Sequence, residues 1–154
     1  MTFAKRRRIF LMRHGSVTYF DAAGKPVLPE TVPLNEQGRA QAQAMGRWMQ
    51  QQRLRPDGVL SSQWCRCQDT ARLAFGQVEA WPALNSTFAG QGEAAAQEEA
   101  LRARLRQMPA MRMEVWVTHQ VNMTALTGAY PDLGEAFVLA DFQAGLKARQ
   151  TAIK

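Results

Sequence analysis

The chain is poor in the residues that build metal centres and disulfide frameworks. Its 154 residues include only two cysteines, Cys65 and Cys67, and two histidines, His14 and His119. A single residue separates the cysteines, which makes a poor disulfide, and two such cysteines with two distant histidines match no standard zinc pattern. We therefore expect reduced thiols, which are typical of a cytoplasmic protein, and no bound metal.

The sequence also lacks a long hydrophobic run. No apolar stretch approaches the roughly 20 residues that cross a bilayer. The basic run at residues 5–8 is not followed by the apolar core and cleavage site of a signal peptide. These features predict a cytoplasmic protein with no membrane partner. The length and the 46% of hydrophobic residues predict one globular domain over residues 1–154.

Positive charge is in excess: 19 lysines and arginines against 13 aspartates and glutamates give a net charge of +6. Such a charge suits an anionic partner, for example a phosphorylated metabolite, a phosphoprotein or a nucleic acid. The basic run at residues 5–8 leads straight into a predicted strand, and we interpret it as the solvated start of that strand. Because no nucleic-acid motif or aromatic-rich basic pattern is present, we expect no nucleic-acid partner.

Strand-like and helix-like segments alternate along the chain. Short apolar runs predict strands at residues 8–12, 59–61, 114–118 and 137–139. Periodicity and end signals predict helices at residues 36–52, from within 62–67 to 75, at 93–108 and at 122–127. Asn35 is the expected cap of the first helix and Gly76 the stop of the second. The alternation predicts an α/β fold: a three-layer α/β/α sandwich with a mostly parallel sheet. A long loop at residues 16–34, a second loop at 81–92 and a polar tail complete the expected layout.

Polar clusters follow three of the predicted strands. They are Arg-His-Gly at residues 13–15, the Ser-Ser pair leading to Arg66 at residues 61–66, and Thr-His-Gln at residues 118–120. In open α/β sheets, ligands bind outside the carboxyl ends of the strands. We therefore expect two arginines and both histidines to converge on one point.

These residue types suit phosphoryl transfer. Arg13 and Arg66 would clamp the non-bridging phosphate oxygens. One imidazole would attack phosphorus, while the other would stabilise charge on the transferring group. Because histidine supplies the nucleophile and arginine the charge, this chemistry needs no cofactor.

Four motifs give the chain a resemblance to the histidine phosphatase superfamily, which includes phosphoglycerate mutases and small phosphohistidine phosphatases. They are LMRHG at residues 11–15, LNEQGRAQA at 34–42, LSSQWCRCQDTA at 60–71 and VTHQVN at 117–122. The resemblance implies a phosphoglycerate mutase-like fold. It also implies a phosphatase that forms a covalent phosphohistidine on His14, with Arg13 and Arg66 binding phosphate and His119 completing the pocket. The partner would be a small phosphorylated substrate or a phosphoprotein.

Three further residues are candidate substrate contacts. Gly15 lets the backbone approach a ligand closely. Ser62 suits a phosphate contact or, equally, a turn or helix-cap role. Gln120 stands where the family commonly has glycine, and its backbone N–H can still face the phosphate.

The sequence departs from the family pattern at two positions. Many members have asparagine six residues after the nucleophile, where this chain has Phe20. Many also have a glutamate that protonates the leaving group, and Ser86 stands at that place. Serine is a poor general acid near pH 7. Glu93, at the start of the next helix, is our first candidate donor, although a helix-dipole role would also explain it. Asp21 and Glu30 are the other candidates.

Phe20 and Ser86 keep a second function open: a catalytically weak or inactive phosphate-binding domain of the same fold. A mutase is less well supported than a phosphatase, because family mutases carry long insertions and the segment between Arg66 and His119 is short. A cysteine phosphatase fails on spacing, since Cys67 and Arg72 have four residues between them and Cys65 and Arg72 have six.

Overall fold

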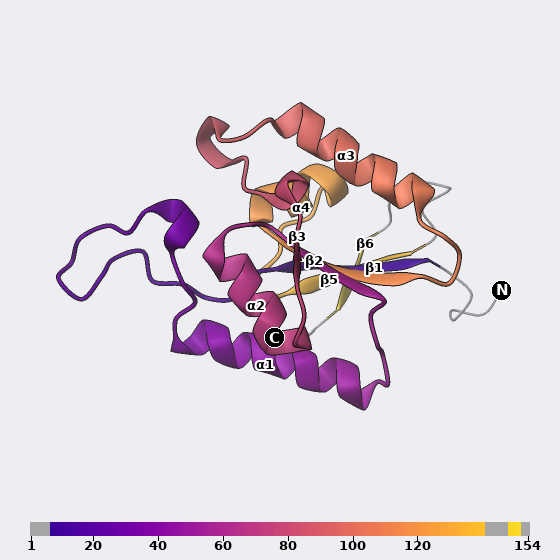
Figure 1. Ribbon diagram of the computed structural model, residues 1–154, viewed down its shortest axis with the longest axis horizontal. Helices are drawn as coiled ribbons and strands as arrows, with labels where there is room; N and C mark the ends of the chain where they lie inside the picture. The colour runs from indigo at the N-terminus through magenta and orange to yellow at the C-terminus, as the bar shows by residue number, and fades with distance from the viewer. Residues whose placement is uncertain (1–6, 141–147, 152–154) are drawn as a thin grey trace.

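A six-stranded sheet forms the centre of the molecule (Figure 1). The computed structural model describes residues 7–140 and 148–151. The strands lie in the order β3-β2-β4-β1-β5-β6. Their bounds are Arg8–Arg13 (β1), Gly58–Ser61 (β2), Glu79–Ala80 (β3), Met113–Thr118 (β4), Ala136–Ala140 (β5) and Ala148–Thr151 (β6). Strands β3, β2, β4 and β1 pair in parallel, while β5 and β6 pair antiparallel, so the predicted mostly parallel sheet is confirmed.

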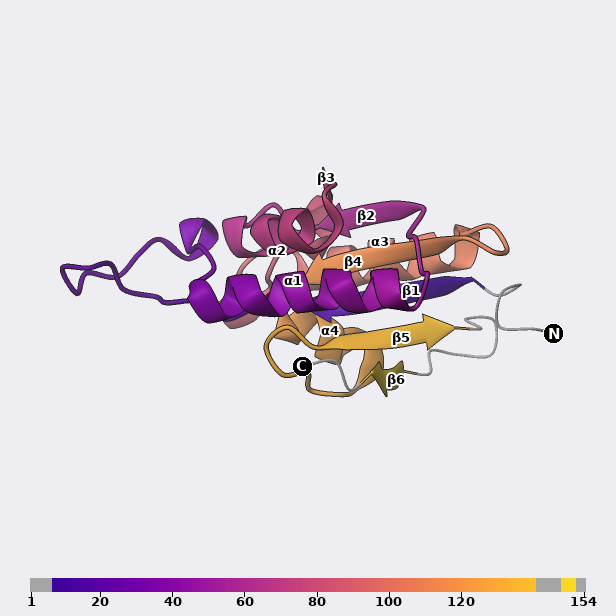
Figure 2. The same cartoon turned by 90° about the horizontal axis from the view of Figure 1, so that it is seen from below.

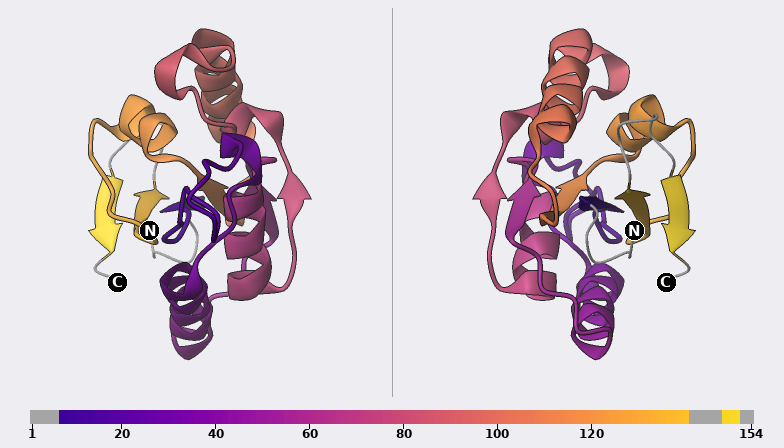
Figure 3. Two further views of the ribbon diagram at one scale, coloured as in Figure 1. Left: turned by 90° about the vertical axis from the view of Figure 1, so that its left-hand side faces the viewer. Right: turned by 90° about the vertical axis from the view of Figure 1, so that its right-hand side faces the viewer.

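Two helices cover each face of the sheet. Helices α1 (Glu36–Gln51) and α2 (Cys65–Phe75) lie on one face (Figure 2), and α3 (Ala94–Gln107) and α4 (Gln120–Thr127) lie on the other (Figure 3). Because side chains alternate along a strand, Phe10 and Met12 of β1 pack with α1 and α2, while Ile9 and Leu11 pack with α3 and α4. These two apolar cores give the predicted three-layer α/β/α sandwich.

The local end signals act as the sequence predicts. The Asn35 side chain accepts a hydrogen bond from the Gly38 N–H at 2.9 Å and caps α1. Gly76 ends α2 with a φ of 71°, a left-handed conformation that glycine adopts without strain. Helix α4 begins at Gln120, two residues before its predicted start. Capping and stop residues are thus predicted correctly from local sequence.

Short and irregular elements are where the structure differs from the prediction. Strand β3 has only two residues, and β6 lies in the predicted polar tail, where it pairs with β5 through backbone groups. The predicted loops contain 3-10 turns: η2 (Pro29–Thr31), η3 (Pro82–Leu84) and η4 (Phe88–Gly90). Residues 141–147 of the predicted tail lie outside the described residues. Within the described ranges, no helix is long and apolar enough to cross a membrane.

A close backbone contact fixes the turn after β1. A Cβ atom on Gly38 would lie 2.1 Å from the Ser16 carbonyl oxygen, and one on Gly15 would lie 2.7 Å from the Gly38 carbonyl oxygen. Only glycine fits at either position, so the first turn of α1 packs directly against the chain that leaves β1. This contact holds the carboxyl end of β1 in place.

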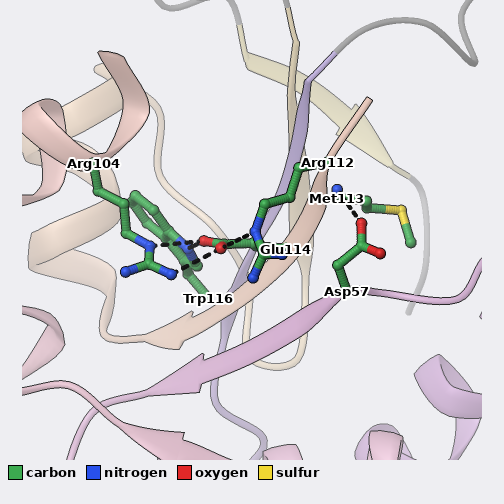
Figure 4. A network of polar contacts seen from close by, with 6 residues as sticks. All are labelled: Asp57, Arg104, Arg112, Met113, Glu114 and Trp116. Atoms are coloured by element: carbon green, nitrogen blue, oxygen red, sulfur yellow. Dashed lines mark hydrogen bonds and ion pairs between the residues drawn. The ribbon is translucent and has the colours of Figure 1, made fainter. Parts of the chain in front are cut away.

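A buried carboxylate lies at the opposite end of the sheet, near the start of β4 (Figure 4). The side chain of Glu114 is 1% exposed. Arg104 donates to both of its oxygens, at 2.9 and 2.8 Å, and Arg112 and Trp116 donate at 2.7 and 2.9 Å. Burial alone would raise the pKa of Glu114, but these hydrogen bonds outweigh it and lower the pKa to about 2. The carboxylate is therefore ionised at neutral pH.

We expect Glu114→Gln to destabilise the fold by about 3 kcal/mol, because the amide leaves two guanidinium groups without their counter-charge. This value is at the low end of the usual destabilisation for breaking a buried ion pair, because both arginines are partly solvated. Glu98→Gln, which removes a more exposed pairing with Arg102, is the matched control and should cost at most about 0.5 kcal/mol. Urea unfolding at pH 7 measures both. Equal small losses would mean that the buried network contributes nothing beyond a surface pair.

Candidate active site

A cavity of about 590 Å³ lies where β1, β2 and β4 end. Its lining includes Arg13, His14, Arg66, His119 and Gln120. These residues come from three separate segments, each following a different parallel strand. The structure therefore brings together the two arginines and two histidines that the sequence motifs single out.

The backbone around His14 is held from two sides. The His14 N–H donates to the Thr118 carbonyl at 3.2 Å, and the Gly134 N–H donates to the His14 carbonyl at 3.0 Å. The ring Nδ1 lies 2.8 Å from the Gly15 carbonyl oxygen, which can only accept. Nδ1 must therefore carry the ring proton, and Nε2 keeps its lone pair. This tautomer is the one that a nucleophilic imidazole requires.

His119 lies beside His14 in the same cavity. The two ring centroids are 5.5 Å apart, with the planes inclined at 67°. On its other side His119 meets the ring of Trp64, with centroids 4.8 Å apart. Both histidines are nearly buried, at 3% and 5% exposure. Both imidazole rings are thus largely shielded from water.

Ser62 orients the His119 ring through a hydrogen bond with Nε2. The Ser62 hydroxyl donates to Asn85 Oδ1 at 3.1 Å, an oxygen that also accepts from the Gln63 N–H at 2.8 Å. The hydroxyl oxygen is then free to accept from His119 Nε2, which lies 2.9 Å away. Ser62 is fully buried and is not part of the cavity lining, so its contact with a substrate would run through His119. Sequence reasoning missed Asn85, because no local signal links it to a residue 23 positions earlier.

Arg13 and Arg66 each have one buried N–H donor without a hydrogen-bond partner. Arg13 Nη1 donates to the Pro131 carbonyl at 3.0 Å, and Arg66 Nη2 donates to the Pro29 carbonyl at 2.9 Å. The Nε atoms of both arginines are buried and have no hydrogen-bond partner in the structure. Buried donors without a partner lower stability, and the two guanidinium charges beside the cavity favour an anion there.

Aromatic rings hold the Arg66 guanidinium. Its central carbon lies 4.9 Å from the Trp64 ring centroid and 5.6 Å from that of Tyr19. Arg66 Nη1 also donates to the Tyr19 hydroxyl at 3.4 Å. Tyr19 belongs to the long loop after β1, so this loop and Arg66 position each other. No signal in the sequence predicts this contact.

Burial and the arginines keep both histidines neutral. Burial lowers the pKa of His14 to about 3, and the nearby charges of Arg66 and Arg13 act in the same direction. Burial likewise lowers the pKa of His119 to about 2, with further contributions from His14 and the arginines. Burial also lowers the pKa of Arg13. At neutral pH the site therefore offers two uncharged imidazoles between two guanidinium groups.

Of the predicted substrate contacts Gln120 and Gly15, only Gln120 lines the cavity. The Gln120 side chain turns to Thr124 Oγ1 at 2.7 Å, which leaves its backbone N–H at the first position of α4, where helical N–H groups have no intrahelical partner. Gly15 does not line the cavity, and its N–H donates to Thr70 Oγ1 at 3.2 Å.

No carboxylate of the described residues lines the cavity. Glu93 is exposed, directly precedes α3 and makes no side-chain cap hydrogen bond, so the structure does not bring this candidate proton donor to the histidines. Asp21 and Glu30 are also exposed and outside the lining. Ser86 does line the cavity and is 6% exposed, with its hydroxyl accepting from the Phe88 N–H at 3.2 Å.

The thiols and acidic groups form no metal centre in the part of the chain that the structure describes. Cys65 and Cys67 are free thiols, the first exposed and the second buried. Cys67 Sγ lies 3.5 Å from His119 Nε2. Burial raises the pKa of the Cys67 thiol, so it stays protonated and is a weak nucleophile.

Mild acid should destabilise the protein through these two histidines. In the unfolded chain both histidines have the ordinary pKa of 6.5 and take up a proton below that pH, whereas in the folded protein His14 and His119 stay neutral. Their contribution to the free energy of unfolding is therefore fully present above pH 6.5. It falls as the pH drops below that value, by about 2 kcal/mol per histidine at pH 5. The lowered pKa of Glu114 acts only below its ordinary value of 4.5. Urea unfolding at pH 7.5 and about pH 5 should show a smaller acid loss in His14→Asn and in His119→Asn than in the parent. An unchanged acid loss in both variants would contradict the assignment.

Comparisons with known proteins identify a family from the sequence and a shared fold from solved structures. The sequence profile of the histidine phosphatase superfamily (branch 1) matches residues 9–120. A search of curated protein sequences finds no match. Among solved structures, the protein histidine phosphatase SixA complexed with tungstate is similar at a TM-score of 0.70 and 18% identity, over 94% of this chain and 96% of that one.

Two further structures show the same fold. A putative alpha-ribazole-5'-P phosphatase from Escherichia coli has a TM-score of 0.70 at 20% identity, covering 94% of this chain and 95% of its own. A phosphoglycerate mutase from Thermus thermophilus has a TM-score of 0.69 at 19% identity, covering 96% and 99%. The family match spans the histidines and arginines that converge on the cavity, and the chain belongs to the histidine phosphatase superfamily.

Proposed function

We propose that this protein is a metal-independent phosphatase that hydrolyses a phosphomonoester or a phosphohistidine through a covalent intermediate on His14. The observation that carries the proposal is the Nδ1–H contact with the Gly15 carbonyl, because it leaves the Nε2 lone pair available inside a cavity flanked by two arginines. Membership of the superfamily supports phosphatase chemistry in general.

In the first step, His14 Nε2 attacks phosphorus. A P–N bond forms as the bond from phosphorus to the leaving group breaks, and that group departs with the bonding electron pair. Arg13 and Arg66, which both line the cavity, balance the charge on the non-bridging oxygens. In the second step, water attacks phosphorus, the P–N bond breaks and inorganic phosphate leaves.

The leaving group takes its proton from water in this proposal, because none of the described carboxylates lines the cavity. Substrates whose leaving group needs little protonation therefore suit the site best. An acidic phenol meets this condition, and so does an imidazole, which titrates near neutral pH. The name of the SixA relative, a protein histidine phosphatase, is consistent with the second class.

A phosphate-binding domain without turnover is the alternative function. The positions of Ser86 in the lining and of Glu93 outside it favour this alternative, since neither supplies a strong general acid. It predicts tight phosphate or vanadate binding with no hydrolysis of any phosphate ester.

Changing the nucleophile tests the mechanism directly. His14→Ala should lower turnover of an aryl phosphate by several orders of magnitude, because the attacking group is lost. Rapid quench with labelled substrate should trap an acid-labile, base-stable phosphoenzyme in the parent protein and none in the variant. A parent-like rate in His14→Ala would rule out His14 as the nucleophile, and a matched circular dichroism spectrum would show that the variant is folded.

Metal removal provides an independent test. Activity should survive a chelator, because the proposed chemistry uses imidazole and guanidinium groups only. Vanadate, which adopts the five-coordinate geometry of phosphorus in the transition state, should inhibit competitively. Loss of activity with chelator and its recovery with zinc or magnesium would make the histidines metal ligands instead.

A further inference from the structure

The cavity holds the positive charge that one phosphoryl group requires and no more. Arg13 and Arg66 are the only permanently charged residues among its described lining, and both histidines are neutral there. A phosphoryl group carries about two negative charges at neutral pH, which the two guanidinium groups balance. A second carboxylate or phosphate on the substrate would meet no counter-ion among these lining residues.

The outer part of the lining is aromatic. Tyr19 and Phe88 line the cavity and are 50% and 65% exposed, so each ring offers surface to a ligand. Tyr19 comes from the loop after β1 and Phe88 from η4, and these two segments lie at the same end of the sheet (Figure 1). Trp64 is 8% exposed and already contacts Arg66 and His119, which leaves Tyr19 and Phe88 as the accessible rings.

The polar part of the cavity suits the phosphoryl group of a substrate, and the aromatic part suits the group attached to it. The two histidines are nearly buried and line the cavity together with Arg13 and Arg66, and the phosphoryl group would bind there. Anything attached to that group must extend toward the exposed rings. A planar, uncharged ring gains stacking and apolar contact there, whereas a charged group gains no partner.

We propose that the leaving group of the substrate is an uncharged aromatic ring that packs against Phe88 and Tyr19, and that substrates bearing a second anionic group are rejected. This inference rests on the proposed phosphatase function and narrows its substrate class. The shared chemistry includes an oxygen-linked aryl or arylmethyl phosphate and an N-phosphoryl imidazole. It excludes phosphorylated hydroxy acids and bisphosphates.

A matched pair of substrates separates ring recognition from leaving-group acidity. Benzyl phosphate and cyclohexylmethyl phosphate both release a primary alcohol, and they differ in whether the ring is aromatic. We expect kcat/KM to favour benzyl phosphate by about tenfold. Phe88→Leu should reduce this ratio to about twofold or less. Phe20→Leu, the same change at an exposed ring outside the lining, should leave the ratio unchanged.

A second pair tests the charge rule. The 4-carboxybenzyl and 4-carbamoylbenzyl phosphates have nearly the same shape, but only the first carries a second anion. We expect kcat/KM for the carboxylate to be at least about tenfold lower. Adding an N-phosphoryl imidazole and phenyl phosphate to the series then distinguishes nitrogen-linked from oxygen-linked aromatic substrates.

Failure of this inference differs from failure of the proposed function. Equal rates for benzyl and cyclohexylmethyl phosphate, or equal rates for the carboxylate and the amide, would overturn the inference while leaving the phosphatase intact. If neither the esters nor the N-phosphoryl imidazole is hydrolysed, the phosphatase proposal fails, and calorimetric binding of benzylphosphonate and cyclohexylmethylphosphonate replaces the rates. Tighter binding of benzylphosphonate, reduced in Phe88→Leu but not in Phe20→Leu, supports the inference, and equal binding of the two phosphonates overturns it.

Discussion

Parallel pairing of β4 between β1 and β2 is the constraint from which the candidate site follows. The three strands run in one direction, so the chain leaves each of them at the same edge of the sheet. Arg13 pairs with Thr118, and the residues that follow, His14 and His119, are thereby placed side by side. A site built on adjacent strand ends inherits the rigidity of the sheet, which suits a reaction that depends on fixed charges rather than on moving groups.

Arginines at the two ends of the sheet differ in whether a carboxylate pairs with them. At the start of β4, Arg104 and Arg112 are paired with the buried carboxylate of Glu114. At the other end, Arg13 and Arg66 donate to carbonyl oxygens and to Tyr19, the described lining of their cavity contains no carboxylate, and each retains a buried Nε without a partner. Internal pairing stabilises the fold, whereas guanidinium groups in a lining without carboxylates favour an anion in that cavity.

The same positive field controls the histidines. Neutral imidazole is the nucleophilic form of histidine, and burial beside two guanidinium groups favours that form across the neutral pH range. Ser62 and Asn85 then fix the proton of His119, and the Gly15 carbonyl fixes that of His14. Neither histidine depends on a carboxylate partner for its orientation, and this fits the absence of acidic residues from the described lining.

The sequence by itself determined the layers of the fold and the residues that meet at the strand ends. Apolar runs, the Asn35 cap and the Gly76 stop are local signals, and alternating strands and helices leave few topologies to choose from. Tertiary structure alone decided which loop side chains reach or support the cavity. Two loop residues, Tyr19 and Phe88, line the cavity, and Asn85 supports it through Ser62. The paths of these loops depend on long-range packing. Glu93, by contrast, is exposed and lies outside the lining. Strand β6 likewise exists because β5 offers its edge, a backbone interaction that side-chain periodicity does not encode.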